Sequence, residues 1–240
     1  SSLSFGLAYT WSKAMDLVAG NNNIAIGNPG VAAEGGTIRI GDTPHSRAFM
    51  AGISGQGYRP KEYRYWESRG SLAYRASWQG AIEGGADWVQ LTTWNDFSES
   101  TQISPYTDIA GSSGTGYFNL TGFYASWFSS GSMPAIAHDV LYYFYRKHSI
   151  HAVAAKAGQR DKNAVFWQPG ADLIEVVGFL ERPGTLAISV AGTRHTKDVG
   201  AGVQSFSVPL GTGTPSFALL RDNRVVISFE GNTPIVGEDR

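Results

Sequence analysis

The sequence contains no cysteine, which excludes disulfide bonds and thiolate metal sites in this chain. Its formal net charge is −1 at pH 7, and no cluster of basic residues forms the electrostatic footprint of a nucleic-acid-binding protein. No apolar run approaches the length of a membrane-spanning helix. The five histidines show no metal-ligand spacing, so we expect neither a bound metal nor a cofactor.

Apolar residues make up 42% of the 240 residues and aromatic residues 12%, which is ample for a packed core. The length suits one large domain or two smaller ones. The sequence starts at Ser1 with no initiator methionine and no signal-peptide pattern. We therefore expect a processed chain or a fragment of a longer one.

The most informative stretch runs from Ala86 to Pro105. Residues 88–94 are rich in Val, Thr and Trp, which predicts a strand, and their nearly continuous apolar character favours burial on both faces of a parallel sheet. Asp96 and Glu99 then leave the C-terminal end of that strand, three residues apart. In a (β/α)8 barrel this edge carries the active site, and a glycosidase needs two such carboxylates.

A purely structural interpretation of the same residues stays open. An Asn-Asp pair after a strand is an ordinary way to open a turn, and Asp is a common cap at a helix N-terminus.

Further strands and helices are expected around this stretch. Residues 3–10, 47–54 and 86–94 predict three strands, and residues 71–83 predict a helix with its apolar side chains on one face. A helix between two strands favours parallel pairing with a right-handed crossover. Residues 19–44 predict a long surface loop, with or without a function. Arg75, within the helix, could pair with a carboxylate, but we expect it to be solvated.

Residues 55–60 predict a loop, and Tyr58, Tyr65 and Trp66 lie in it or shortly after it. Aromatic faces stack on sugar rings, so these side chains are candidate walls of a sugar subsite. Core packing is the alternative, because it claims most aromatic side chains.

Helices are predicted at 120–129 and 135–148, and the second of these ends the first part of the chain. After about residue 153 the character of the sequence changes, and short β-runs follow. We expect these runs to form a β-sandwich of about 80 residues, packed as an accessory domain, with hairpin connections at 182–184 and 221–223. The predicted division is therefore into residues 1–152 and 153–240. The runs are 165–167, 173–180, 185–190, 204–209, 216–221 and 224–229.

Residues 94–100, Trp-Asn-Asp-Phe-Ser-Glu-Ser, resemble the signature of glycoside hydrolase family 71, the endo-α-1,3-glucanases or mutanases, whose pattern is close to Trp-Asn-Asp-Tyr-Gly-Glu-Ser. A related signature, Trp-Asn-Glu with a second acid, belongs to family 99, and Asp96 favours family 71. The resemblance covers about residues 5–148. Looser similar blocks lie at 6–12, 49–54, 65–70 and 132–144.

The resemblance implies a fold and a partner. The class is α/β: the C-terminal part of a (β/α)8 TIM-type barrel, followed by the all-β sandwich. The three predicted strands match the last three strands of such a barrel, so we expect a second polypeptide to complete it, and no activity from this chain alone. Polysaccharide is the implied substrate, and a secreted or cell-surface location is implied with it.

The resemblance also implies roles for particular residues. Asp96 is the expected general base and Glu99 the general acid of an inverting hydrolysis. Alternatives are a non-catalytic carbohydrate-binding or cell-surface protein, and a glycosidase of the endo-mannosidase type. The expected substrate-binding residues are Trp94, Asn95, Trp11, Tyr58, Trp66 and His138.

Overall fold

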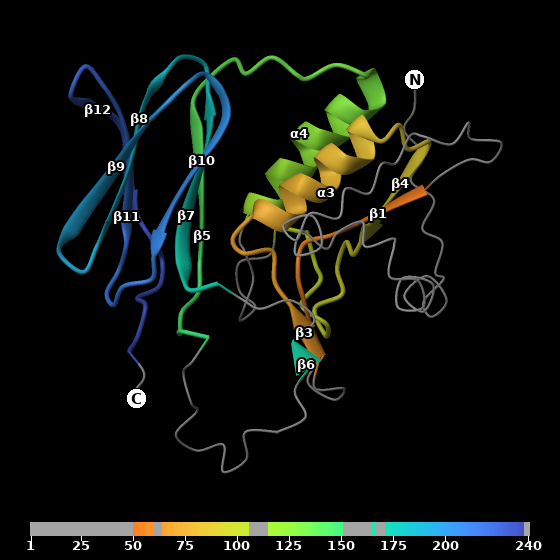
Figure 1. The fold of residues 1–240 in the computed structure, drawn as a ribbon, viewed down its shortest axis with the longest axis horizontal. Helices are drawn as coiled ribbons and strands as arrows, with labels where there is room; N and C mark the ends of the chain where they lie inside the picture. Colours follow the sequence, from red (N-terminus) through yellow and green to blue (C-terminus); the bar gives the residue numbers. More distant parts are fainter. Residues whose placement is uncertain (1–49, 60–63, 106–114, 151–164, 167–170, 238–240) are drawn as a thin grey trace, which may run out of the picture.

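The computed structural model describes residues 50–59, 64–105, 115–150, 165–166 and 171–237 (Figure 1). Strands β2, β3 and β6 are described for the most part by their backbone alone. The predicted strand at 3–10 and the predicted loop at 19–44 lie outside the described residues.

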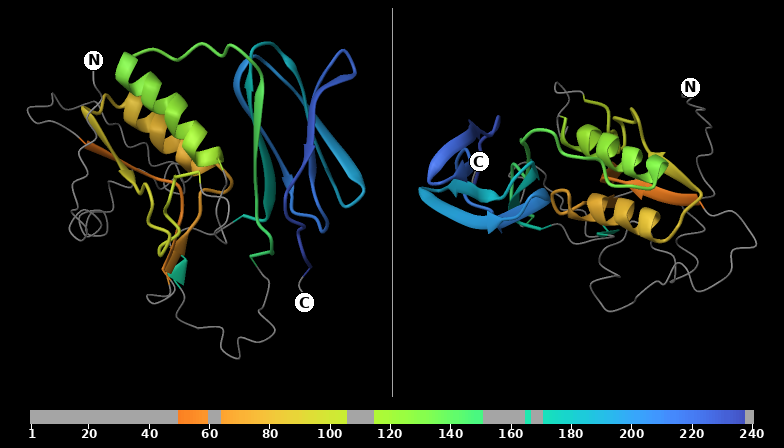
Figure 2. Two further views of the ribbon diagram at one scale, coloured as in Figure 1. Left: turned by 180° about the vertical axis from the view of Figure 1, so that it is seen from behind. Right: turned by 90° about the horizontal axis from the view of Figure 1, so that it is seen from above.

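Two helices separate a pair of parallel strands from a β-sandwich. Helices α3 (Leu72–Glu83) and α4 (Gly116–Ser130) run side by side between the two regions (Figures 1 and 2). Buried side chains of both helices pack against strand β1 on one side and against the nearer sandwich sheet on the other. The helices therefore bury two opposite faces, and one continuous apolar core joins the two regions.

The predicted strand–helix–strand unit is confirmed. Strand β1 (Met50–Ser54) pairs in parallel with β4 (Trp88–Thr92), in a register that runs from Met50–Trp88 to Ser54–Thr92. Helix α3 lies between them in the chain and buries Tyr74, Trp78 and Ala81, which belong to the face that its periodicity predicts. It ends at Gly84.

The expected burial of β4 on both faces is wrong. Trp88 is 56% exposed, and the other β4 residues are half-buried. Among the described residues β4 has β1 as its only strand partner. These residues form a mixed α/β fold with antiparallel sheets and two parallel strand pairs, β1–β4 and one in a small separate sheet, and they close no barrel.

A small three-stranded sheet replaces the predicted loop at 55–60. Strand β2 (Gly57–Arg59) pairs antiparallel with β3 (Arg64–Trp66), and β3 pairs in parallel with β6 (Val165–Phe166). The run at 165–167 therefore adds its strand to this sheet and not to the sandwich.

The predicted β-sandwich is present and consists of two antiparallel sheets (Figure 1). One sheet has the order β10-β7-β5 and the other β12-β11-β8-β9, and apolar side chains from both fill the space between them. The strands are β5 (Val140–Tyr145), β7 (Leu173–Leu180), β8 (Gly184–Val190), β9 (Thr193–Val199), β10 (Gly202–Pro209), β11 (Ser216–Arg221) and β12 (Arg224–Glu230).

The helix predicted at 135–148 is wrong, because residues 140–145 form strand β5 beside β7. Leu141, Tyr143 and Tyr145 face the sandwich core, and the residues between them face the helices. This strict alternation has the period of a strand. Strand β5 precedes residue 152 and pairs with β7, which follows it, so the sandwich includes a strand from the first predicted part. The division of the chain into two domains at residue 152 stays a prediction.

Of the two hairpins predicted in the sandwich, at 182–184 and 221–223, the structure contains the second. Residues 182–184 are not a hairpin, since β7 and β8 belong to different sheets. The hairpin at 221–223 is confirmed, with Asp222 and Asn223 at positive φ of 48° and 59° between the paired strands β11 and β12. Both residues tolerate this conformation, and it matches the twist of a two-residue hairpin.

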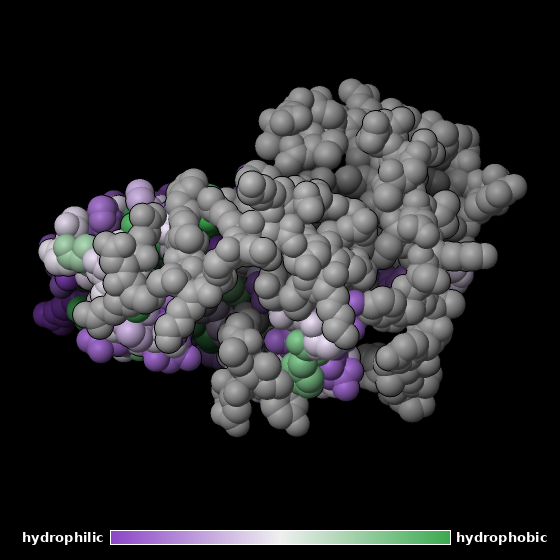
Figure 3. Space-filling view, turned by 90° about the horizontal axis from the view of Figure 1, so that it is seen from below, coloured by the Kyte–Doolittle hydropathy of each residue, from purple (hydrophilic) through white to green (hydrophobic). Residues whose placement is uncertain are grey.

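Strand β9 was not predicted, because its sequence Thr-Arg-His-Thr-Lys-Asp-Val has almost no apolar residue. It is an edge strand that pairs with β8 and is largely exposed. Charged side chains are typical of sheet edges, where they oppose pairing with other chains. The described surface over the sandwich is accordingly mainly hydrophilic when the molecule is viewed from below (Figure 3).

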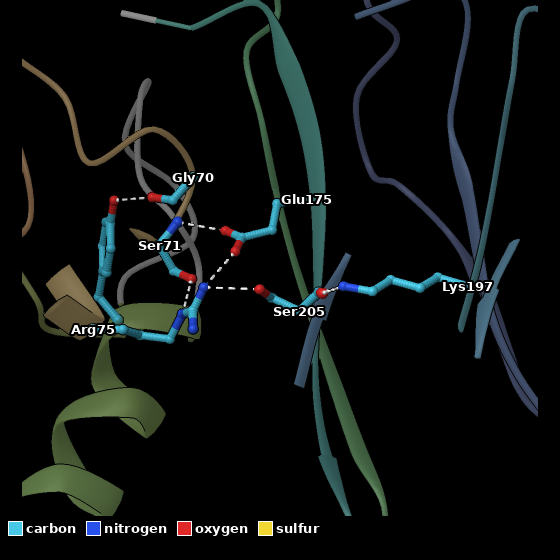
Figure 4. A network of polar contacts seen from close by, with 7 residues as sticks. Gly70, Ser71, Arg75, Glu175, Lys197 and Ser205 are labelled. Atoms are coloured by element: carbon cyan, nitrogen blue, oxygen red, sulfur yellow. Dashed lines mark hydrogen bonds and ion pairs between the residues drawn. The ribbon is translucent and has the colours of Figure 1, made fainter. Parts of the chain in front are cut away.

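A buried polar network ties the start of α3 to the sandwich (Figure 4). Arg75 Nη2 donates to Glu175 Oε1 at 2.9 Å and to Ser205 Oγ at 3.0 Å, and the backbone N–H of Ser71 donates to Glu175 Oε2 at 2.5 Å. The side chain of Glu175 is 2% exposed and that of Arg75 is 12% exposed. The expectation that Arg75 is solvated is therefore wrong.

A second ion pair joins the two sheets at their rim. Arg221, at the end of β11, donates from both terminal nitrogens to Asp139, just before β5, and the Glu181 N–H also donates to Asp139. Hydrogen bonding from Arg221 holds the pKa of the Asp139 carboxyl below its ordinary value. The carboxylate therefore stabilises the folded state above about pH 4, and this contribution is lost as pH falls through the lowered pKa.

We expect Asp139→Asn to lower the free energy of unfolding by about 1 kcal/mol near pH 6. The difference from the parent should shrink as the pH falls from about 4 through the lowered pKa of Asp139, because the carboxyl then becomes neutral like the asparagine amide. Urea unfolding at several pH values measures it. Asp222→Asn, in the exposed hairpin turn, is the control, and a pH-independent effect of Asp139→Asn would contradict the assignment.

Candidate active site

The segment after β4 folds back on itself as a hydrogen-bonded loop, residues 93–104, which we call the carboxylate loop. The Thr93 N–H donates to the Thr101 carbonyl at 2.9 Å, and the Ile103 N–H donates to the Thr93 carbonyl at 3.0 Å. The Thr93 and Thr101 hydroxyls lie 2.8 Å apart. These cross-links hold the loop in one conformation at the C-terminal end of the strand.

Asp96 lies near the tip of this loop and is half-buried. Its Oδ1 accepts hydrogen bonds from Ser98 Oγ at 2.7 Å and from the Glu99 N–H at 3.2 Å, and its own N–H donates to Thr93 Oγ1 at 3.0 Å. This is a turn stabilised by an aspartate side chain, which is the structural role left open by the sequence. Within the described part of the chain, Oδ2 accepts no hydrogen bond. The catalytic role of Asp96 stays a prediction.

Glu99 is half-buried on the same loop, and its backbone N–H is the group that contacts Asp96. Ser100 follows at a positive φ of 54°, and its N–H donates to the Phe97 carbonyl at 3.3 Å. Asp96 and Glu99 are therefore carried by one hydrogen-bonded turn.

Trp94 and Asn95, both predicted to contact substrate, are exposed at the start of the loop. The ring of Trp94 packs edge-to-face against Phe118, with centroids 6.0 Å apart and an interplanar angle of 62°. Sequence reasoning missed Phe118. The helical periodicity of α4 could have revealed it. Tyr117, Leu120 and Tyr124 occupy the buried face of the helix, and Phe118 lies off that face, which leaves its ring exposed.

The other predicted site residues are not brought to the loop by any described contact. Tyr58 lies in β2 opposite Tyr65, and Trp66 lies in β3 opposite Gly57. His138 is exposed in the segment before β5, and it makes no hydrogen bond within the part of the chain that the structure describes. Trp11 lies outside the described residues. The substrate roles of all four stay predictions.

The carboxylate loop ends in a buried segment, Thr101–Ser104. Gln102 Oε1 and Ser104 Oγ have no hydrogen-bond partner among the described residues. A buried polar atom without a partner costs about 1–3 kcal/mol, so hydrogen bonds from these two atoms do not explain why the segment is buried. Its position follows from the backbone pairing with Thr93 and Trp94.

Two further properties concern the described residues only. No group of three or more His, Asp or Glu side chains in them is placed to hold a metal ion. None of their helices is long and apolar enough to cross a membrane.

Comparison with known proteins adds to this geometry. A profile described as glycosyl hydrolase family 71 matches residues 38–239, which is most of the chain and includes the carboxylate loop. The chain belongs to glycosyl hydrolase family 71. The predicted resemblance to family 71 is thus confirmed. No solved structure matches the chain.

Three curated relatives of this family 71 chain carry informative names. The "Ascus wall endo-1,3-alpha-glucanase" of Schizosaccharomyces pombe is 29% identical over 194 residues, 68% of this chain and 43% of the relative. The "Mutanase Pc12g07500" of Penicillium rubens is 25% identical over 174 residues, 66% of this chain and 38% of the relative.

The third is the "Glucan endo-1,3-alpha-glucosidase agn1" of Schizosaccharomyces pombe, which is 24% identical over 200 residues, 77% of this chain and 46% of the relative. The family 71 chain therefore spans less than half the length of each of these relatives.

Proposed function

We propose that this chain supplies the C-terminal part of an endo-acting hydrolase of α-1,3-glucan. Membership of family 71 and the names of the three relatives support this substrate and linkage. The observation that carries the proposal is the placement of Asp96 and Glu99 on one hydrogen-bonded turn at the C-terminal end of a parallel strand. In barrel enzymes this edge binds substrate.

The proposed reaction uses the two carboxylates in different protonation states. Glu99 donates a proton to the glycosidic oxygen as the bond from that oxygen to the anomeric carbon breaks. Asp96 accepts a proton from a water molecule that attacks the anomeric carbon from the opposite face. The product then has the inverted, β configuration. For Asp96, the oxygen that takes part is Oδ2, because Oδ1 is engaged by Ser98 and Glu99.

We further propose that a second polypeptide completes the barrel and that the assembled enzyme acts outside the cell or at its surface. Among the described residues, the sheet that carries the carboxylate loop has two strands, β1 and β4. The chain spans 38–46% of the length of the three relatives. Strands that lack neighbours leave backbone groups unpaired, which another chain can satisfy.

Native mass spectrometry followed by an activity assay tests this function. We expect a complex with a second polypeptide that releases reducing ends from insoluble α-1,3-glucan, with the β anomer seen first by proton NMR. The chain alone should release few or none. Hydrolysis of α-1,3-glucan that first yields the α anomer would contradict inversion, and hydrolysis of α-mannosides instead of α-1,3-glucan would contradict the substrate.

A non-catalytic carbohydrate-binding protein is the second candidate, favoured by the engagement of Asp96 Oδ1 in a turn. It predicts glucan binding that survives Asp96→Asn and Glu99→Gln, with no reducing ends released by the parent complex.

A further inference from the structure

Trp94 and Phe118 form a pair of exposed aromatic rings beside the carboxylate loop. Trp94 is 49% exposed and Phe118 is 40% exposed. Such side chains leave a large apolar area in water, which is unfavourable. Exposed apolar surface with a polar rim commonly marks a binding site.

The two rings come from elements that meet at one edge of the fold. Trp94 begins the loop at the C-terminal end of β4, and Phe118 lies in the first turn of α4, the next helix. The backbone that carries each ring is anchored. The Ser104 N–H donates to the Trp94 carbonyl at 3.0 Å, and Tyr117 and Leu120 anchor the start of α4 in the core.

We propose that Trp94 and Phe118 form a platform on which one glucosyl ring of an α-1,3-glucan stacks, next to the bond that is cleaved. Trp94 contacts the sugar, and Phe118 is a positioning residue that holds the indole through its edge-to-face contact. This inference rests on the proposed function and adds to it a residue that the sequence did not reveal.

The chemistry of the surroundings fits a sugar ring. A pyranose has apolar C–H faces and a rim of hydroxyl groups, so it suits an aromatic surface beside hydrogen-bonding groups. Exposed Asn95 and Ser98 lie on the same loop as Trp94. Trp88 is also exposed, but it lies at the opposite end of β4, away from the carboxylates. It is therefore a matched control.

The test measures binding of soluble α-1,3-linked glucose oligosaccharides by calorimetry, with the full chain and any polypeptide that copurifies with it. Asp96→Asn is present throughout to prevent hydrolysis. We expect Trp94→Ala to weaken binding about tenfold and Phe118→Leu about threefold, since aromatic pairs contribute about 0.5–1.5 kcal/mol beyond area burial. Phe118→Tyr should restore binding, and Trp88→Ala should leave it unchanged.

Steady-state kinetics of variants that keep Asp96 distinguish a role of Phe118 in positioning Trp94 from a role in folding. Phe118→Leu should raise KM with little change in kcat, because stacking is made equally in the ground and transition states. Thermal unfolding is the control, and an unchanged KM with a lowered Tm would overturn the positioning role.

The remaining outcomes distinguish the platform from the function. If the parent binds or cleaves α-1,3-glucan and Trp94→Ala binds it equally well, the platform is wrong and the function stands. If the parent neither binds nor cleaves the glucan, the proposed function and the platform both fail. Equal affinity of the parent for β-1,3-linked oligosaccharides would overturn the assignment to α-1,3-glucan.

Discussion

Asp96→Asn is expected to lower the hydrolysis of α-1,3-glucan by about 100-fold or more, since a positioned general base contributes about 10²–10⁴-fold. The replacement keeps Oδ1 as an acceptor for Ser98 and Glu99, so the turn should persist. Asparagine lacks the charge needed to take a proton from water. Initial rates of reducing-end release, with calorimetric binding as a folding check, measure the effect.

Matched variants separate the chemistry of Asp96 from its role in the turn. Ser98→Ala removes one hydrogen bond to Oδ1 and should lower the rate only severalfold. Asp96→Ala removes both bonds and should also lower the thermal stability. Near-parental turnover of Asp96→Asn would contradict its role as a base.

Glu99→Gln is expected to lower the rate of α-1,3-glucan hydrolysis about as much as Asp96→Asn does. The two variants should differ in how their rates depend on the leaving group of the substrate. Fluoride needs little protonation to leave, so an α-1,3-linked oligosaccharyl fluoride should be cleaved by Glu99→Gln and not by Asp96→Asn. The reverse pattern would exchange the acid and base assignments. Loss of both activities in Glu99→Gln would contradict its role as an acid.

Glu175→Ala is expected to lower the free energy of unfolding by about 3–5 kcal/mol, which is the usual cost of breaking a buried ion pair from one side. The change leaves the Arg75 guanidinium without its carboxylate and the Ser71 N–H without its acceptor. Urea unfolding measures it. The double variant Arg75→Met with Glu175→Leu should recover much of the loss, because no uncompensated charge remains. Failure of the double variant to recover would contradict an electrostatic cause.

Gly70 offers a second approach to the same network. A Cβ at Gly70 would lie against Glu175 Oε2, and the residue has a positive φ of 72°. Gly85 has a similar φ of 65° with open space around it. Both Gly→Ala variants carry the backbone strain, so the additional loss in Gly70→Ala measures the displacement of the Glu175 carboxylate. Equal losses would mean that the carboxylate moves aside without cost.

Local patterns were sufficient for part of the fold. The β1–α3–β4 unit follows from two largely apolar runs on either side of a helix-periodic segment. The β11–β12 hairpin follows from Asp222-Asn223. Residues 140–145 show the opposite case. The sequence Val-Leu-Tyr-Tyr-Phe-Tyr is apolar throughout, so its residues fit either period, and pairing with β7 makes it a strand.

The sequence by itself determined the family-like loop, with Asp96 and Glu99 placed after a strand, because those features depend on neighbours in the chain. Only the tertiary structure decided that Arg75 meets Glu175 and that Phe118 meets Trp94. Residues of the first pair lie 100 positions apart in the chain, and no local period relates them. Such contacts exist only after the helices pack between the sandwich and the parallel strands. That packing buries the Arg75–Glu175 ion pair and brings the two partly exposed rings together.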